Sequence, residues 1–333
     1  MRNTMADKRV DQQAIAEKLG ISRSTVTRVL NHDPLHRISP ATREQIFRTA
    51  AELGYQARRR RTGNIALVVC GEMASAQQEL HLAICEEALK SDYRVFLVRM
   101  PEMPSYSHIS LHVNPQTSDG AVLTGRFSDE LAGQVSDILP LVLVGNNRAA
   151  NDVDTIVFDD VQLGRMLTSE LISAGHRRVA MIVQFPQDIR WAGAAEGYRL
   201  AHEEAGLRAD LSLVASKSGR FYPELLAAIL SSDPKPTGLL AITSSDHALI
   251  LTTLMAMGCI VPRDLSYVGW AYSYTSALLP FLRITCLDDL YGAMARSAVR
   301  RLLDRAENRA LPAERIEVSV GVNPGETCVP VSK

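Results

Sequence analysis

The first 62 residues carry an excess of side chains that could bind a polyanion. They hold 13 Lys and Arg against 6 Asp and Glu, a balance of +7, whereas residues 63–333 hold 23 against 31, a balance of −8. Guanidinium groups neutralise phosphate, and one arginine can also donate two parallel hydrogen bonds to guanine O6 and N7. Arg23 and Arg28 share one short segment, and four consecutive arginines occupy 58–61. The pattern indicates a basic nucleic-acid-binding head on a mildly acidic body.

Other chemistries lack their motifs in this sequence. G-x-S-x-G, H-E-x-x-H, a Walker loop and a strand followed by G-x-G-x-x-G are all absent. The histidines do not have zinc-site spacing, and no two cysteines form a C-x-x-C pair. We therefore expect no enzyme activity, no cofactor and no metal. The cysteines are expected to be reduced, small hydrophobic side chains: Cys70, Cys85, Cys259, Cys286 and Cys328.

Length and polarity place limits on the class of protein. A chain of 333 residues with 46% hydrophobic content can form two or three compact units. The N-terminus is polar where a secretory leader would be apolar, and no run reaches the roughly 18 apolar residues of a membrane span. We expect a cytoplasmic protein with no membrane partner.

Two short helices are predicted at the start of the head. The first covers 12–19, and Gly20 follows it, where a helix end favours the left-handed conformation. Ser22 offers a capping hydroxyl for the second helix, whose apolar stripe leaves Arg23, Ser24, Thr27 and Arg28 facing outward. That stripe consists of Val26, Val29 and Leu30.

A third helix is predicted from Ser39 and Pro40, a cap followed by a first-turn proline. Its expected buried face ends before Gly54 and consists of Ile46, Phe47, Ala50 and Leu53. Three short helices thus share one small core.

These elements resemble, in order, the helix-turn-helix of the lactose-repressor (LacI) family. The resemblance rests on Ala14–Asn31 (AIAEKLGISRSTVTRVLN), Ser39–Glu44 (SPATRE) and Ala51–Tyr55 (AELGY). It implies that Arg23, Ser24 and Arg28 read base edges in the major groove. It also implies that Thr25, Thr27 and Asn31 contact phosphates and position the helix.

The linker departs from the family pattern. It is shorter and lacks the leucine with which the family wedges open the minor groove. Arg58, Arg59, Arg60 and Arg61 are expected to contact phosphate or to enter a narrow minor groove, and the alternative is a solvated tether. We expect the operator to bend less than with a leucine-wedge repressor.

From Ile65 onward, short apolar runs alternate with helical stretches, which is typical of parallel sheets covered on both faces. The expected fold is an all-α helix-turn-helix head followed by an α/β body of two doubly wound parallel-sheet lobes. The resemblance extends thinly over this region and implies lobes of the periplasmic-binding-protein-like type. Its landmarks are 118–123 (SDGAVL), 173–180 (SAGHRRVA), 196–199 (EGYR) and 261–269 (VPRDLSYVG).

Three domains are predicted from these patterns. The head covers 1–57, the Arg-rich linker 58–63 and the ligand-sensing and dimerisation domain 64–333. The family's three crossings between lobes place lobe one at 64–174 plus 285–312, and lobe two at 175–284 plus 313–333.

The effector pocket is expected to lie between the lobes, beyond the carboxyl ends of the strands. Ala194 stands where the family usually has a sugar-clamping arginine, and Gly269-Trp270-Ala271-Tyr272 replaces G-[FY]-D-D. Asp246 matches the family's pocket aspartate, with a plain helix cap as the alternative. An unusual ligand and the absence of any small effector both stay open. The remaining candidates, each with a structural role as its alternative, are Glu72, Asn146, Asp160, Trp191, Phe221 and Tyr272.

Together these features predict a sequence-specific transcription regulator, in function a repressor. It would bind a pseudo-palindromic operator as a homodimer, with a small effector whose identity the sequence does not give. A solute-binding protein of periplasmic type is the alternative. It would explain the two lobes but not the basic head.

Overall fold

The computed structural model describes residues 11–30, 38–53, 61–71, 75–145, 152–183, 189–216, 222–243, 246–270 and 282–331. By their internal contacts they belong to two compact units. One unit is Met1–Gly71 with Ala88–Leu141 and Leu302–Leu311; the other is Glu72–Glu87 with Val142–Arg301 and Pro312–Lys333. Over the described ranges, no helix has the length and apolar character needed to cross a bilayer.

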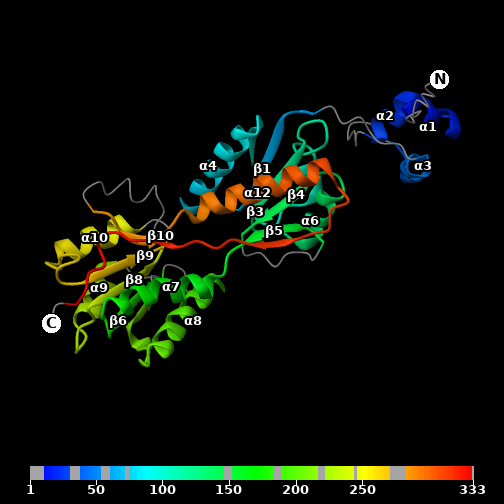
Figure 1. The fold of residues 1–333 in the computed structure, drawn as a ribbon. Coiled ribbons are helices and arrows are strands. Elements are labelled where there is room, and N and C mark those ends of the chain that lie inside the picture. The colour runs from blue at the N-terminus through cyan, green and yellow to red at the C-terminus, as the bar shows by residue number, and fades with distance from the viewer. Residues whose placement is uncertain are drawn as a thin grey trace, which may run out of the picture. The chain divides into compact units, whose positions relative to one another are not determined.

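The head consists of three helices: α1 (Gln12–Leu19), α2 (Arg23–Leu30) and α3 (Pro40–Glu52) (Figure 1). Their starts are as predicted, and so is the end of α1, whereas Gly54, the predicted stop of the third helix, lies outside the described residues. Asp11 caps α1 by accepting from the Ala14 amide at 2.9 Å, and Gly20 ends it with a φ of 65°. Ser39 caps α3 by accepting from the Thr42 amide at 3.1 Å. Short helices are marginal alone, so these caps and the shared core fix them.

The core of the head is formed by the predicted apolar stripes, with one correction. Ile15, Val26, Val29 and Ile46 are fully buried, with Ala16 and Ala50 beside them. Phe47, predicted to be in the core, is 39% exposed. It follows Ile46 directly, so the 100° step of the helix turns it away from the face that Ile46 and Ala50 share.

The first sheet has six strands in the order β11-β5-β4-β3-β1-β2. β1 pairs in parallel with β2 and β3, so six of its seven residues are buried, whereas β2 lies at the edge. Strand order reverses beside β1, as in other doubly wound sheets. The strands are β1 (Asn64–Cys70), β2 (Arg94–Met100), β3 (Gly120–Gly125), β4 (Leu141–Val144), β5 (Asp154–Val157) and β11 (Arg315–Glu317), and the helices of this region are α4 (Ser75–Lys90), α5 (Tyr106–Ser110), α6 (Asp129–Ser136) and α12 (Leu290–Glu307).

The second sheet also has six strands, in the order β12-β10-β9-β8-β6-β7, and only β12 is recorded antiparallel to its neighbour. Its core joins the apolar faces of α9 and α10 to β8 and β9. The strands are β6 (Val179–Val183), β7 (Val214–Ser216), β8 (Gly238–Ile242), β9 (Ser266–Gly269), β10 (Thr285–Leu287) and β12 (Val322–Asn323), and the helices are α7 (Asp160–Ser173), α8 (Ile189–Glu204), α9 (Tyr222–Leu230) and α10 (His247–Ala256), with a 3-10 turn at Leu211–Leu213.

Glycines allow α7 and α8 to pack closely. A methyl group on Gly164 would lie 2.5 Å from the carbonyl oxygen of Ala194, and one on Gly193 would lie 2.7 Å from Cβ of Asp160. A methyl group on Gly197 would overlap the carbonyl oxygen of Val161. The two helices therefore approach backbone to backbone.

Three segments belong to a different sheet from the one predicted. α7 contacts β6, β8, β9 and β10, and β10 itself pairs with β9, so both lie with the second sheet rather than in lobe one. β11 pairs with β5, so it lies with the first sheet rather than in lobe two. Such short strands carry no periodicity that reveals their partner. The predicted limits of the head and the linker stay predictions.

A buried ion pair holds β5 and the segment before β11 together. Nε of Arg301, on α12, lies 2.8 Å from Oδ1 of Asp154, a side chain with no exposed surface. The same carboxylate accepts from the Glu314 amide at 2.9 Å. Because both charges are paired and hydrogen-bonded, the desolvation cost of burial is offset.

Candidate functional site

The α2 helix presents its basic side chains on a face fixed by the core behind it. Ser22 accepts from the Thr25 amide at 3.1 Å, as expected of its cap, and Val26 and Val29 are buried beneath. Arg23 and Arg28 are exposed, and within the described part of the head neither has a recorded ion pair. A rigid helix with exposed arginines in its first two turns suits insertion into a major groove.

The hydroxyl groups of α2 are engaged within the head. The Ser22 hydroxyl lies 2.8 Å from the hydroxyls of both Ser24 and Thr25. The Thr27 hydroxyl lies 2.6 Å from Oε1 of Gln12, on α1, and 2.9 Å from the carbonyl oxygen of Arg23. Their assignment to base or phosphate contacts stays a prediction, since each hydroxyl would have to share or exchange these partners on DNA.

The rest of the predicted DNA surface lies mostly outside the described residues. This is so for Asn31, Arg58, Arg59 and Arg60. Arg61 is described, and its guanidinium contacts Tyr93.

Asp246 occupies the N-cap position of α10. It precedes α10, but its side chain makes no capping hydrogen bond. Oδ2 instead accepts from the Tyr222 hydroxyl at 2.6 Å, while the Asp246 amide donates to the Thr243 hydroxyl at 3.1 Å. Burial, with the hydrogen bond to Asp246 next, raises the pKa of Tyr222 above its ordinary value. A carboxylate so held at the carboxyl end of β8 is an acceptor suited to a ligand's O–H or N–H.

His247 fixes the region behind Asp246. The ring is fully buried, with Nδ1 2.6 Å from the Tyr267 hydroxyl and Nε2 3.1 Å from the carbonyl oxygen of Thr243. Since a carbonyl oxygen only accepts, Nε2 donates the hydrogen bond to Thr243. Burial lowers the pKa of His247 to about 4. The imidazole is therefore neutral at neutral pH.

The remaining effector candidates are only partly described. Asp160 opens α7, where Asp159 makes the capping bonds to the amides of Val161 and Gln162. Trp191 lies within α8, but its side chain is outside the described residues. So are the whole residues Glu72, Asn146, Phe221 and Tyr272.

Two aromatic residues near this region were missed by sequence reasoning. Trp270 follows β9 and packs against Phe158, with ring centroids 5.7 Å apart. Tyr222, the partner of Asp246, follows the predicted candidate Phe221 directly. A tyrosine at the start of an apolar helical run was the available signal, because a buried hydroxyl needs a polar partner.

Ala194 has no exposed surface. It packs in the contact between α7 and α8, where its backbone approaches Gly164. Ala194 therefore serves helix packing, and its match to a sugar-clamping position stays a prediction.

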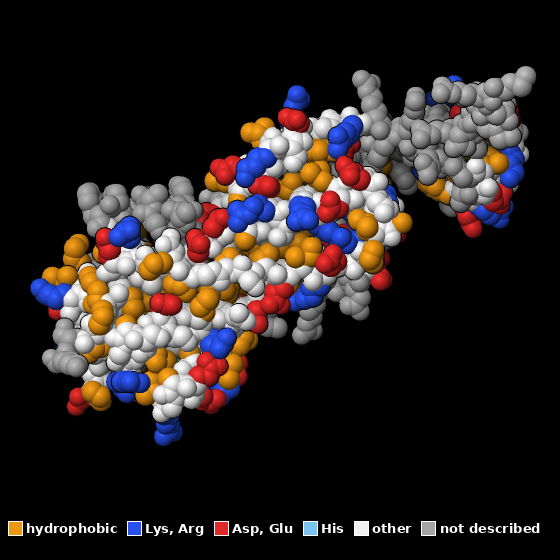
Figure 2. All heavy atoms as spheres, viewed as in Figure 1, with side chains coloured by type: hydrophobic (Ala, Val, Ile, Leu, Met, Phe, Trp, Pro, Cys, Tyr) orange, Lys and Arg blue, Asp and Glu red, His pale blue; other side chains and the backbone are white. Residues whose placement is uncertain are grey.

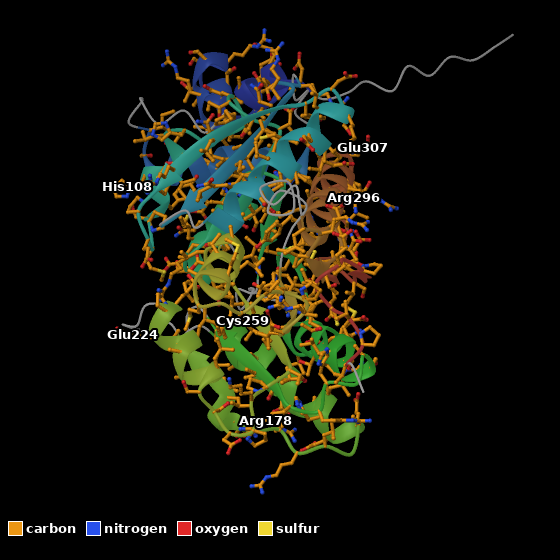
Figure 3. The ribbon with its side chains drawn as sticks, turned by 90° about the vertical axis from the view of Figure 1, so that its left-hand side faces the viewer. His108, Arg178, Glu224, Cys259, Arg296 and Glu307 are labelled. Atoms are coloured by element: carbon orange, nitrogen blue, oxygen red, sulfur yellow. The ribbon has the colours of Figure 1, made fainter. Side chains whose placement is uncertain are left out.

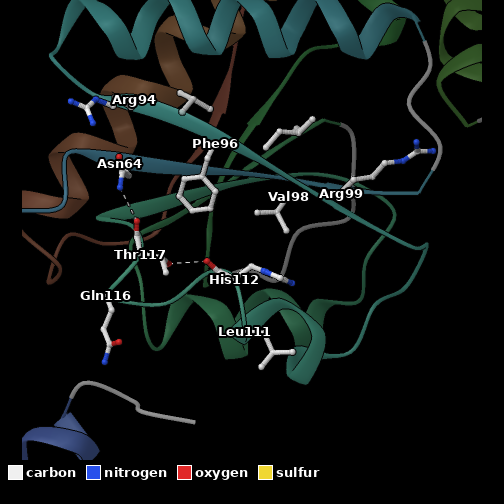
Figure 4. A pocket seen from close by; sticks show the side chains of 11 residues that line it. Asn64, Arg94, Phe96, Val98, Arg99, Leu111, His112, Gln116 and Thr117 are labelled. Atoms are coloured by element: carbon white, nitrogen blue, oxygen red, sulfur yellow. Dashed lines mark hydrogen bonds between the residues drawn. The ribbon is translucent and has the colours of Figure 1, made fainter. Parts of the chain in front are cut away.

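A surface hollow of about 850 Å³ lies along the edge strand β2 (Figure 4). Leu97 and Leu111 are 53% and 60% exposed there, and Arg94 and Arg99 carry its positive charge. Thr117 fixes the loop opposite by hydrogen bonds with Asn64 and with the carbonyl oxygen of His112. The hollow lies on the first sheet. None of the predicted effector residues is among the described residues that line it.

Side chains that could ligate a metal ion, and cysteine thiols, also lie among the described residues. Within the described ranges, no group of three or more His, Cys, Asp and Glu could hold a metal ion. Cys70 is buried, which raises the pKa of its thiol to about 12, and Cys259 (Figure 3) is half-buried. On the face shown in Figure 2, acidic and basic side chains of the body are interspersed.

Comparisons with known proteins match the first helices and the second half of the chain to two different family models. Residues 13–57 match the family described as bacterial regulatory proteins of the lacI family, and residues 168–328 match the periplasmic binding protein-like domain. The chain is 29% identical over 314 residues to the HTH-type transcriptional regulator CelR of Thermobifida fusca, covering 88% of this chain and 91% of that protein. It is 27% identical over 272 residues to the regulator DegA of Bacillus subtilis, covering 77% and 80%.

Solved structures of transcription regulators are similar to this chain in fold. A CelR–cellobiose complex is similar with a TM-score of 0.63 and 27% identity, over 96% of this chain and all of that one. The lac repressor dimer bound to operator and an anti-inducer has a TM-score of 0.62 at 18% identity, over 97% of this chain and all of that one, which shows the fold alone.

Proposed function

The chain belongs to the LacI family of DNA-binding transcription regulators, and on this premise we propose that it is a homodimeric repressor of a pseudo-palindromic operator. Each subunit would place one α2 helix in a major groove, with Arg23, Ser24 and Arg28 at the base edges. Such a regulator works in the cytoplasm and needs no catalytic step.

The exposed arginines of α2 are the observation that carries this proposal. Arg23 and Arg28 lie on a helix whose opposite side, at Val26 and Val29, is fully buried. The helix therefore meets DNA without rearrangement of its backbone. Each arginine can supply two parallel donors to a guanine, the commonest specific contact in the major groove.

Exposed apolar side chains at two places support a homodimer. Leu97 and Leu111 are more than half exposed beside the edge strand β2, and Leu249 and Met255 are more than half exposed on α10. A twofold dimer buries the same patch on both subunits, so exposed leucines on an edge strand suit it. Two heads held in this way match two half-sites one helical turn apart.

An effector would bind at the carboxyl ends of the second sheet. Asp246 follows β8 there, Trp270 follows β9, and both lie in one compact unit. The carboxylate would accept a hydrogen bond from the ligand, and Trp270 would supply apolar surface. The effector would change operator affinity through its unequal affinity for two states of the protein.

Selection from random double-stranded DNA by the full-length protein tests this function. We expect an inverted repeat, with half-sites about 10 base pairs apart or a multiple of that, bound by two chains. The double variant Arg23→Ala, Arg28→Ala should enrich no site while its head remains folded. A single unsymmetric site bound by one chain would contradict the proposal.

A further inference from the structure

The end of the linker is tied to the first sheet by Arg61. Its Nε donates to the Tyr93 hydroxyl at 2.9 Å, and its Cζ lies 5.3 Å from the centre of the Tyr93 ring. Tyr93 is only 4% exposed, and its own amide donates to the carbonyl oxygen of Ala88. One rigid aromatic side chain thus offers Arg61 both an acceptor and a π face.

Asp119 holds the next two residues. Its Oδ1 accepts from the Thr62 amide and its Oδ2 from the Gly63 amide, each at 2.9 Å. Asp119 as a residue is 5% exposed, so these charge-assisted bonds are shielded from water. Gly63 has a φ of 71°, a conformation that directs consecutive amides to one acceptor and that other residues adopt only with strain.

The neighbouring backbone completes the attachment. The Arg94 amide donates to the carbonyl oxygen of Gly63 at 2.8 Å, and the Asp119 amide donates to that of Asn64 at 2.8 Å. The Asn64 side chain donates to the carbonyl oxygen of Thr117 at 3.1 Å. Residues 61–64 are therefore fixed to the starts of both β2 and β3, on either side of β1.

We propose that Tyr93 and Asp119 form a linker anchor, and that Arg61 acts as a positioning residue within it instead of a phosphate contact. The anchor fixes residues 61–63 of the predicted 58–63 linker to the lobe, so only Arg58, Arg59 and Arg60 of that linker lie outside it. A short tether with a fixed end limits the distance between two heads. This inference rests on the proposed binding to two half-sites.

Salt dependence of operator binding separates anchoring from phosphate contact. The probe is the operator selected by the wild-type protein, with Arg61→Ala compared against the matched variant Arg60→Ala. Loss of one phosphate contact flattens the slope of log K against log salt by about 0.9. We expect Arg61→Ala to leave the slope unchanged. A slope flattened by about one contact would overturn the proposal.

Half-site spacing supplies the readout of positioning. Operators with one base pair added or removed at the centre should be rejected by the wild type. In Arg61→Ala the preference for the best spacing over the shifted ones should fall by about threefold or more, because a freed tether is less preorganised. An unchanged preference in Arg61→Ala would overturn the proposal.

Two further variants test whether the effect passes through the anchor. Tyr93→Leu removes the partner without changing charge, and Tyr93→Phe keeps the ring while losing the hydroxyl. Tyr93→Leu should relax the spacing preference as Arg61→Ala does, and the double variant should add nothing further. Additive effects would overturn the proposal. Thermal unfolding shows whether the Tyr93 variants are folded, and Arg61→Ala, at an exposed position, decides the question if they are not.

Failure of the proposed function would look different. If the wild type itself showed no spacing preference, binding to two half-sites would be wrong. The salt slope of Arg61→Ala would still decide whether this arginine contacts phosphate.

Discussion

At the scale of single residues, Arg23 and Arg28 differ from the hydroxyl residues between them. The hydroxyls of Ser24, Thr25 and Thr27 already have partners within the head. The two arginines are exposed on a helix whose backbone is fixed. When an arginine contacts a base, the side chain therefore loses conformational entropy but breaks no hydrogen bond within the described part of the head.

Arg28→Ala should weaken operator binding by about 1 to 3 kcal/mol and leave binding to random DNA nearly unchanged, because a bidentate base contact is lost. Fluorescence anisotropy on the selected operator and on a scrambled duplex measures both. Arg48→Ala is the matched control, since Arg48 is an equally charged residue on α3 with a side chain 68% exposed. Equal losses on both duplexes would mean that Arg28 contacts phosphate.

His247 makes the stability of the protein depend on pH. Burial lowers its pKa from 6.5 to about 4. As the pH falls below about 6.5, the unfolded chain binds a proton that the folded protein excludes, so the free energy of unfolding falls by up to about 1.4 kcal/mol per pH unit. This contribution is fully present above pH 6.5 and is lost as the pH approaches 4.

Urea unfolding between pH 7 and 4.5 tests this in the wild type and in His247→Gln. The variant should be less stable at pH 7, with a pH slope shallower by up to one proton. His81, whose pKa burial also lowers to about 4, and His176, whose pKa burial lowers too, contribute to the slope that remains, and Glu79, whose pKa burial raises to about 7, opposes them. If the free energy of unfolding depended on pH equally in the two proteins, the pKa of His247 would be the same in the folded and the unfolded chain.

Asp246 shows how far the sequence predicts the effector region. Its position before a predicted helix identified it, but the same position fitted a helix cap. The hydrogen bond from the Tyr222 hydroxyl, 24 residues away, holds the Asp246 carboxylate in place of a capping bond. A contact between the first residue of α9 and the residue before α10 leaves no local pattern, so sequence reasoning selected Phe221 instead.

At the scale of elements, the α7–α8 contact depends on Gly164, Gly193 and Gly197. A glycine inside a helix destabilises it by about 0.5 to 1 kcal/mol relative to alanine. Three glycines at one contact therefore indicate that the packing energy gained by close approach of the two helices offsets this destabilisation. The helices of the head were predictable because each has an apolar stripe and a capping residue before it, and because Gly20 and Gly54 follow the first and the third. β10, β11 and β12 have only two or three residues, and their pairing is fixed by how the chain crosses between sheets.

Gly197→Ala should destabilise the protein by about 1 to 3 kcal/mol, because the new methyl group overlaps the carbonyl oxygen of Val161 and forces the helices apart. Gly133→Ala is the matched control. Gly133 lies inside α6 with no atom within 4 Å of the added methyl group, so alanine should stabilise by about 0.5 to 1 kcal/mol. Urea unfolding measures both. A Gly197→Ala protein as stable as the wild type would mean that the close approach is absent in solution.

At the scale of the whole molecule, DNA binding and ligand sensing belong to parts with opposite charge. Residues 1–62, which are the head with the linker arginines, carry +7, and residues 63–333 carry −8. This separation directs the head toward DNA and gives the body no net attraction to it. Any effect of a ligand on the operator must then pass through the linker, which is why its attachment at residues 61–64 matters for regulation.

The ligand itself should not be a common sugar. The family's clamping arginine is replaced by Ala194, which is buried between helices, and one oxygen of Asp246 already accepts from Tyr222. A neutral hexose or pentose would thus lose most of its charge-assisted hydrogen bonds. In a thermal-shift screen, simple sugars at about 10 mM should leave Tm unchanged, since ligand stabilisation grows as RT ln(1 + [L]/Kd). Any compound that does raise Tm should lose its effect in Asp246→Asn. A simple sugar that stabilises the wild type saturably, and stabilises Asp246→Asn equally, would show that recognition rests on other residues.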